Sequence, residues 1–145
     1  MKLTLELTTP ERIVTKEVCD SATIPTAEGE ITVLPGHVPL VGTLAPGMIT
    51  LRHGAEESFL AVSGGFVEVM PDGRVVVLAD TAERAEELDL DKVEEARERA
   101  RVLLSEGRRA DDVATVAAAA ALERELARVR VAKHHRSRRR NLPTS

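Results

Sequence analysis

The residue types that could do chemistry are scattered along this 145-residue chain. Its four histidines are His37, His53, His134 and His135, and its one cysteine is Cys19. The adjacent pair His134–His135 comes nearest to a metal motif, but neighbouring residues on a helix point about 100° apart and chelate poorly. The sequence contains no G-x-x-x-x-G-K-[ST], G-x-G-x-x-G, C-x-x-C or H-E-x-x-H motif. We therefore predict a protein that is not an enzyme and has no catalytic or metal-ligating residues.

Positive charge is concentrated near the C-terminus. Residues 123–145 hold 8 basic and 2 acidic residues, whereas residues 1–86 hold 6 basic and 13 acidic residues. A chain polarised in this way is expected to present its two ends to different partners. The basic residues that we select as candidates for contact with an acidic partner are Arg124, Arg128, Arg130, Lys133 and Arg136.

Three explanations of this basic segment stay open from charge alone. It could be a solvated helix end, favoured by the helix dipole. It could bind a polyanion such as nucleic acid or an anionic membrane. It could also bind a protein with a carboxylate-rich surface, which the planar fork of arginine matches.

The acidic first half has the pattern of short strands. Leu3, Leu5 and Leu7 alternate with polar residues, which indicates a half-buried strand. Further apolar runs are separated by turn signals, and this spacing predicts a sandwich or barrel. We interpret Gly64-Gly65 as structural glycines that allow a close approach of two backbones. Pro46-Gly47 predicts a type II turn in which Gly47 has a positive φ.

The period changes to that of a helix after Asp80. Asp89 is a good N-cap, and Gly107 is a natural stop. A second helix is predicted from Asp111 or Asp112 to about Asn141–Pro143, and the short loop between the helices favours antiparallel packing. Because its run Ala117–Ala121 buries little area, at about 25 cal/mol per Å², we expect this hairpin to be weakly docked and to exchange its amide hydrogens faster than the strands.

The amino-acid composition argues against several further kinds of partner and location. The lone cysteine fits a reducing compartment. Two phenylalanines with no tyrosine or tryptophan argue against a surface that stacks nucleic-acid bases. The N-terminus does not have the pattern of a signal peptide, and no stretch of 18 apolar residues occurs. We therefore expect no nucleic-acid partner, and membrane association only through a complex.

Three segments, in this order and spacing, resemble the epsilon subunit of bacterial F-type ATP synthase. They are Gly29–Leu40 (GEITVLPGHVPL), Ser63–Val69 (SGGFVEV) and Val77–Glu83 (VLADTAE). The resemblance is strong over about the first 90 residues and weak over the helices. It implies an α+β fold, with an N-terminal antiparallel β-sandwich of about ten strands followed by a C-terminal α-helical hairpin. The expected bounds are 1–86 for the docking sandwich, 87–140 for the regulatory hairpin and 141–145 for a tail.

The resemblance also implies a function. The chain would be a non-catalytic central-stalk subunit of the proton-translocating enzyme, located peripherally at the cytoplasmic face of the bacterial cell membrane. Its sandwich would bind the gamma subunit and the c-subunit ring, with Glu30 and His37 at the rotor interface. In an extended state its basic second helix would reach acidic segments of the alpha/beta catalytic hexamer and inhibit ATP hydrolysis. The alternative is a free-standing anion-binding module that uses the arginine-rich helix, which salt-sensitive binding to polyanions would reveal.

Some relatives bind ATP through a stretch of the form Leu/Ile-Asp-x-x-Arg-Ala. The matching segment here is Leu88–Val93 (LDLDKV), so Asp89 and Lys92 are the nucleotide candidates. Lysine replaces the arginine and lacks its planar fork, and valine replaces the alanine. These replacements weigh against ATP as a regulatory ligand, and we expect no other cofactor.

Overall fold

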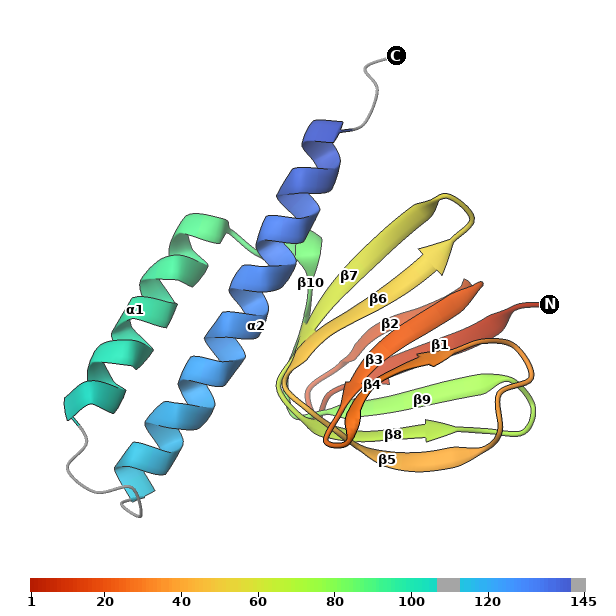
Figure 1. Ribbon diagram of the computed structural model, residues 1–145, viewed down its shortest axis with the longest axis horizontal. Helices are drawn as coiled ribbons and strands as arrows, with labels where there is room; N and C mark the ends of the chain where they lie inside the picture. Colours follow the sequence, from red (N-terminus) through yellow and green to blue (C-terminus); the bar gives the residue numbers. More distant parts are fainter. Residues whose placement is uncertain (107–112, 142–145) are drawn as a thin grey trace.

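The computed structural model describes residues 1–106 and 113–141. Figure 1 shows a β body with two helices along one side. The strands are β1 (Leu3–Thr8), β2 (Ile13–Cys19), β3 (Ser21–Thr26), β4 (Gly29–Val33), β5 (Leu40–Leu44), β6 (Gly47–His53), β7 (Glu56–Val62), β8 (Gly65–Val69), β9 (Arg74–Ala79) and β10 (Ala82–Arg84). A 3₁₀ turn, η1 (Ala85–Glu87), then leads to the helices α1 (Leu90–Glu106) and α2 (Val113–Asn141). None of the helical segments that the structure describes is long and apolar enough to cross a membrane.

The ten strands form one continuous ladder that folds over on itself. The order is β10-β7-β6-β3-β5-β8-β9-β1-β2, and β4 pairs with β3 beside this path. All pairings are antiparallel except β1 with β9, which run parallel. The sequence-based prediction of an α+β fold, with about ten strands before a helical hairpin, is confirmed.

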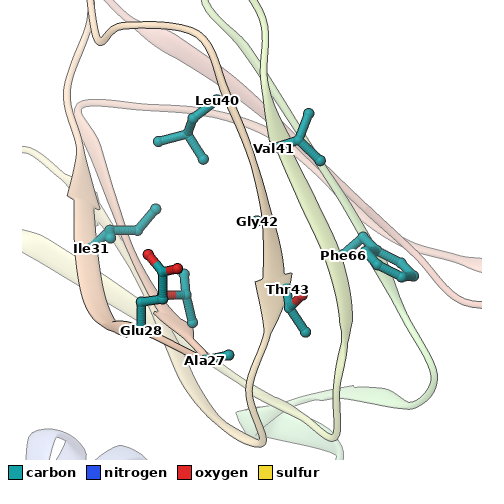
Figure 2. A pocket seen from close by; sticks show the side chains of 9 residues that line it. Ala27, Glu28, Ile31, Leu40, Val41, Gly42, Thr43 and Phe66 are labelled. Carbon is teal, nitrogen blue, oxygen red and sulfur yellow. The ribbon is translucent and has the colours of Figure 1, made fainter.

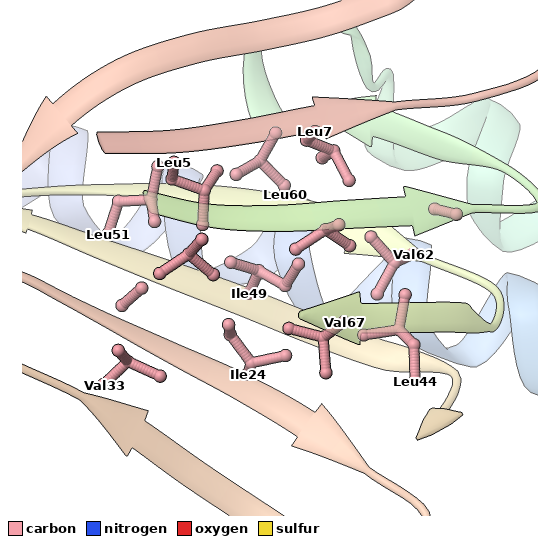
Figure 3. Close-up of a cluster of buried hydrophobic side chains, with 14 of the residues drawn as sticks. Leu5, Leu7, Ile24, Val33, Leu44, Ile49, Leu51, Leu60, Val62 and Val67 are labelled. Atoms are coloured by element: carbon pink, nitrogen blue, oxygen red, sulfur yellow. The ribbon is translucent and has the colours of Figure 1, made fainter. Parts of the chain in front are cut away.

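Alternation along the strands builds the core. Leu3, Leu5 and Leu7 of β1 are buried while the residues between them are partly exposed, as the period of two requires. Figure 3 shows leucine, isoleucine and valine side chains from both layers meeting between them. The apolar area removed from water here is the main stabilising term of the body.

The chain folds back closely at Gly64 and Gly65. Both have φ near +130°, and a Cβ on Gly65 would lie 1.9 Å from the carbonyl oxygen of Leu78. This confirms the interpretation of the pair as glycines that permit a close backbone approach. The predicted positive φ at Gly47 is wrong. Gly47 begins β6 without a positive φ, and its missing side chain instead admits Pro25, whose Cβ and Cγ would lie 3.1 Å from a Cβ there.

The helices pair antiparallel as predicted (Figure 1). The Asp89 Oδ1 atom accepts hydrogen bonds from the backbone N–H groups of Asp91, at 3.0 Å, and Lys92, at 3.4 Å, so Asp89 is the N-cap of α1. The apolar side chains that the helices bury are all alanine or valine: Val93, Ala100, Ala118, Ala127, Val129, Val131 and Ala132. The predicted stop at Gly107, the start at Asp111 or Asp112 and the end at Leu142–Pro143 lie outside the described residues.

A Gly65→Ala substitution tests the close approach. The added methyl would meet the Leu78 carbonyl and also strain a positive φ, so we expect a loss of about 3 to 5 kcal/mol in the free energy of unfolding. The matched control is Gly54→Ala, also at positive φ but with open space around its Cβ, which should lose about 1 kcal/mol. Urea denaturation of both variants measures the difference, and equal losses would contradict this account of Gly65.

Candidate functional site where the helical arm meets the body

We refer to residues 1–86 as the body and to residues 87–140 as the arm. The C-terminal half of α2 lies against β6 and β7 of the body (Figure 1). Val131 is fully buried there in a small apolar cluster with four body residues, Met48, Phe59, Ala61 and Ala85. This cluster is much smaller than the core inside the sandwich, so apolar contact alone holds the arm weakly.

Charged contacts reinforce this small cluster, and the central one joins Arg128 of α2 to Glu83 of β10. The Arg128 Nη2 atom donates to Glu83 Oε2 at 3.0 Å, and Nε lies 2.6 Å from Glu83 Oε1. Arg128 Nη1 also donates to the buried Glu125, at 2.6 Å. Burial lowers the pKa of Arg128, but the hydrogen bonds that it donates to Glu83 and Glu125 outweigh this effect and raise the pKa overall. The guanidinium is therefore charged and donates to two carboxylates through its terminal nitrogens, whereas its buried Nε makes no hydrogen bond among the described residues.

Two further ion pairs join the arm to the body at its two ends. Near the C-terminus of α2, Arg138 Nη2 lies 2.8 Å from Glu57 of β7. At the start of the arm, both terminal nitrogens of Arg12 donate to Glu87, at 3.1 and 2.9 Å. The Arg12 hydrogen bond is the main cause of a lowered pKa at Glu87. Burial raises the pKa of Glu57, but Arg138 and then Arg52 lower it by a larger amount, so the net pKa is below the ordinary value.

Lys133 forms a contact within the arm. Its Nζ atom lies 3.7 Å from a carboxylate oxygen of Glu94 on α1. Beside it, the ring of His134 packs on Phe59 of β7 with centroids 5.6 Å apart, so this histidine helps to seat the helix. Within the residues that the structure describes, no cluster of histidine, cysteine and acidic residues could hold a metal ion.

The other selected basic residues point away from the body. Arg124 is exposed, and its one ion pair among the described residues is with its neighbour Glu125, at 3.6 Å; Arg130 is also exposed. Arg136 lines a cleft of about 390 Å³ between the start of α1 and the end of α2, together with Leu88, Leu90, Ala132, His135 and Arg139. The structure thus divides the five candidates: Arg128 is bound to the body, Lys133 to α1, and the other three face outward.

Glu30 and His37 lie at a different place. Glu30 is exposed on β4, and the half-buried His37 lies in the loop between β4 and β5, where its Nδ1 is 2.7 Å from the Val38 carbonyl oxygen. Neither makes a contact with the arm among the described residues. Asp89 and Lys92 are together at the start of α1, but the Asp89 carboxylate is occupied as the helix cap and Lys92 is exposed.

Sequence reasoning missed the body's half of this contact. Glu83 is the last residue of the segment Val77–Glu83, and Glu57 follows a second glutamate, Glu56. Nothing in the sequence distinguishes either residue from a solvated carboxylate. The signal for Val131 was available. Ala127 and Val131 are apolar residues four positions apart within a segment rich in basic residues, which is the spacing of a helix face that packs against another element.

A second exposed feature lies on the outer face of the sheet formed by β5, β8, β9, β1 and β2. Phe66 pairs with Leu78, Leu78 with Thr8, and Thr8 with Ile13, so these side chains form a row across four strands that is apolar except at Thr8. Phe66, Leu78 and Ile13 are 60%, 54% and 64% exposed, and Val41 beside them is 74% exposed. We call Ile13, Val41, Phe66 and Leu78 the outer apolar face. Contiguous exposed apolar residues of this kind mark interaction surfaces.

Comparison with known proteins decides the family. Residues 2–85 match the family model described as "ATP synthase, Delta/Epsilon chain, beta-sandwich domain". The chain belongs to the epsilon-chain family of ATP synthase. It is 41% identical over 140 residues to the ATP synthase epsilon chain of Chloroflexus aggregans, covering 97% of this chain and 99% of that one. It is 46% identical over 131 residues to the epsilon chain of Moorella thermoacetica, covering 90% and 96%.

Solved structures agree. A chain in the mitochondrial ATP synthase of Euglena gracilis, in a structure of OSCP, F1 and the c-ring, superposes with a TM-score of 0.76 at 31% identity, covering 92% of this chain and 82% of that one. A chain in the central stalk and c-ring of the Tetrahymena thermophila enzyme shares the fold, with a TM-score of 0.51 at 19% identity and coverage of 93% and 96%. The chain is thus a non-catalytic stalk subunit of ATP synthase, within a membrane-associated complex, and the free-standing module has no such support.

The lowered pKa of Glu57 predicts how pH acts on the arm. A carboxylate whose pKa is lowered in the folded state contributes stability that is present above its unfolded pKa, about 4.3, and is lost as pH falls through the folded pKa. At pH 7 a Glu57→Gln variant should unfold about 2 to 4 °C below the natural chain. The difference should disappear at about pH 3.

Thermal unfolding followed by far-UV circular dichroism measures this effect. Glu56→Gln is the matched control, because its carboxylate is the exposed neighbour and has no ion-pair partner among the described residues. A Glu57→Gln deficit that stayed the same down to pH 3 would show that Glu57 does not act through its charge.

Proposed function

We propose that residues 1–86 dock this subunit on the rotor, and that residues 87–140 are a two-state regulatory arm that inhibits ATP hydrolysis when it extends. The observation that best supports this proposal is the Arg128–Glu83 ion pair. In this pair a carboxylate of the subunit's own body binds a basic residue of the arm. Without that carboxylate, the basic residue would be free to bind an acidic partner. The pair thus stabilises the folded arm and competes with the extended one.

The balance between the two states is small enough to be switched. The arm is held by one small apolar cluster and by ion pairs whose side chains are partly exposed, and such pairs contribute about 0 to 1 kcal/mol each. A partner that presents carboxylates to Arg124, Arg128, Arg130, Lys133 and Arg136 offers similar contacts in the extended state. A ligand shifts a conformational equilibrium only by its difference in affinity for the two states, and the acidic segments of the alpha/beta hexamer would supply that difference.

The gamma subunit is the partner that we propose for the outer apolar face. This face is exposed with the arm folded, and no described residue of the arm covers it. The side chains of Glu30 and His37 would meet the c-subunit ring, because neither contacts the arm among the described residues; the backbone edge of β4 is a separate surface. Contact with the ring places the subunit peripherally at the cytoplasmic face of the bacterial cell membrane.

Deletion of residues 88–145 tests the inhibitory role. The truncated subunit keeps the whole body, so it should still assemble with gamma, and ATP hydrolysis by the reconstituted enzyme should rise several-fold. Hydrolysis and co-purification with gamma are measured together. Unchanged hydrolysis with normal assembly would contradict an inhibitory arm, and failed assembly would contradict docking by the body.

A Glu83→Gln substitution tests the competition at Arg128. Removing the carboxylate's charge weakens the folded state only, so the extended state gains population and inhibition of hydrolysis should deepen, by about twofold to fivefold for a loss of 0.5 to 1 kcal/mol. Asp80→Asn is the control, because it also removes a nearby exposed carboxylate but leaves the Arg128 contact intact. Equal hydrolysis in Glu83→Gln and the natural enzyme would show that this pair does not set the balance.

A further inference from the structure

The β body is open along one side, between β4 and β5. Strand β4 pairs with β3 only, and β5 pairs with β8 along its length but with β3 only at Leu44–Thr26. Figure 2 shows the two strands on either side of the opening. Each strand therefore has one edge without a neighbouring strand among the described residues.

The directions of the backbone groups on β4 follow from one hydrogen bond. The Pro25 carbonyl accepts from the Ala45 N–H at 3.0 Å, on the side of β3 away from β4. Pro25 and Glu30 are therefore a pair that exchanges no backbone hydrogen bonds, so Glu30 turns its N–H and C=O to the free edge. These directions alternate along a strand, so Thr32 does the same.

Strand β5 faces the opening in the same way. The Thr43 carbonyl accepts from the Ala27 N–H at 3.0 Å, on the side away from β8. By the same alternation, Val41, two residues earlier, turns its N–H and C=O away from β8 and toward the opening. Both edges thus present unused donors and acceptors.

Between these edges lies a cleft of about 380 Å³. Its lining is mostly apolar and includes Ile31, Leu40, Val41 and Phe66 (Figure 2). Glu28 is the one charged residue in the lining, and its exposed carboxylate lies at the turn before β4. Val41 and Phe66 also belong to the outer apolar face, so the cleft continues the surface assigned to the gamma subunit.

We propose that the free edge of β4 accepts an extended segment of the gamma subunit as an added strand. Edge strands with unpaired N–H and C=O groups are templates for strand addition, and β4 (GEITV) carries neither the lysine nor the proline that commonly protects an edge. The segment is one with an apolar side chain, which enters the cleft, and a lysine or arginine, which pairs with Glu28. This inference depends on the proposed docking to gamma.

A Thr32→Pro substitution tests the added strand. Proline removes the N–H that faces the opening, and proline is tolerated on edge strands where the N–H faces outward, so the body should still fold. Thr32→Ala is the matched control. Both variants lose the 3.1 Å hydrogen bond between the hydroxyls of Thr32 and Thr23, but only alanine keeps the N–H. We expect Thr32→Pro to bind a complex of gamma with the alpha/beta hexamer at least about tenfold more weakly than Thr32→Ala.

Amide hydrogen exchange of the natural chain is the second measurement, and it decides the question if Thr32→Pro does not fold. The Glu30 and Thr32 amides should exchange at least about tenfold more slowly in the complex than in the free subunit. Strand addition would be overturned if the natural chain bound the complex, the two variants bound it with equal affinity, and amide exchange at Glu30 and Thr32 stayed unchanged. That result would leave docking to gamma intact. Protection that appears only when the c-ring is added would overturn gamma as the source. Absence of binding by the natural chain would overturn the proposed docking as well.

Discussion

The structure depends on the separation of charge along the chain. An acidic β body and a basic C-terminal helix attract each other, and the sheet provides Glu83 and Glu57 where α2 crosses it. Without these pairs the arm would be held by a cluster of a few side chains around Val131. The position of the arm therefore depends on this small cluster together with the ion pairs, and a competing acidic surface can replace the ion pairs. Such contacts weaken with salt and at low pH.

The two parts of the molecule differ in how they are built. The body buries long runs of leucine, isoleucine and valine between two layers, and its backbone is fixed by close approaches such as that of Gly65 to Leu78. The helices meet through alanine and valine, which bury little area per residue. A rigid body with a weakly attached arm suits a subunit that stays bound to a rotor while part of it changes position. The outer apolar face and the β4 edge both lie on the rigid part.

Much of this was predictable from the sequence. Period-two alternation in β1, the glycine pair and the Asp89 cap are local signals, because the residues that produce each structure are close together in the chain. The partner of Arg128 was not predictable, since Glu83 lies 45 residues away and only the packing of α2 on the sheet brings them together. The prediction of a positive φ at Gly47 was wrong for the same reason, because the residue that constrains Gly47 is Pro25 on another strand. The free edge of β4 depends on the whole strand order, which no single segment specifies.

The central claim is that the arm leaves the body while the body stays in place, and a distance measurement tests it most directly. Spin labels at Glu11→Cys in the body and Ala120→Cys in the arm, with the buried Cys19 replaced, report their separation by double electron–electron resonance. The account predicts one narrow distribution in the free subunit, a second and longer one in the assembled enzyme, and more of the longer one with Glu83→Gln. A single unchanged distribution in all three samples would contradict it.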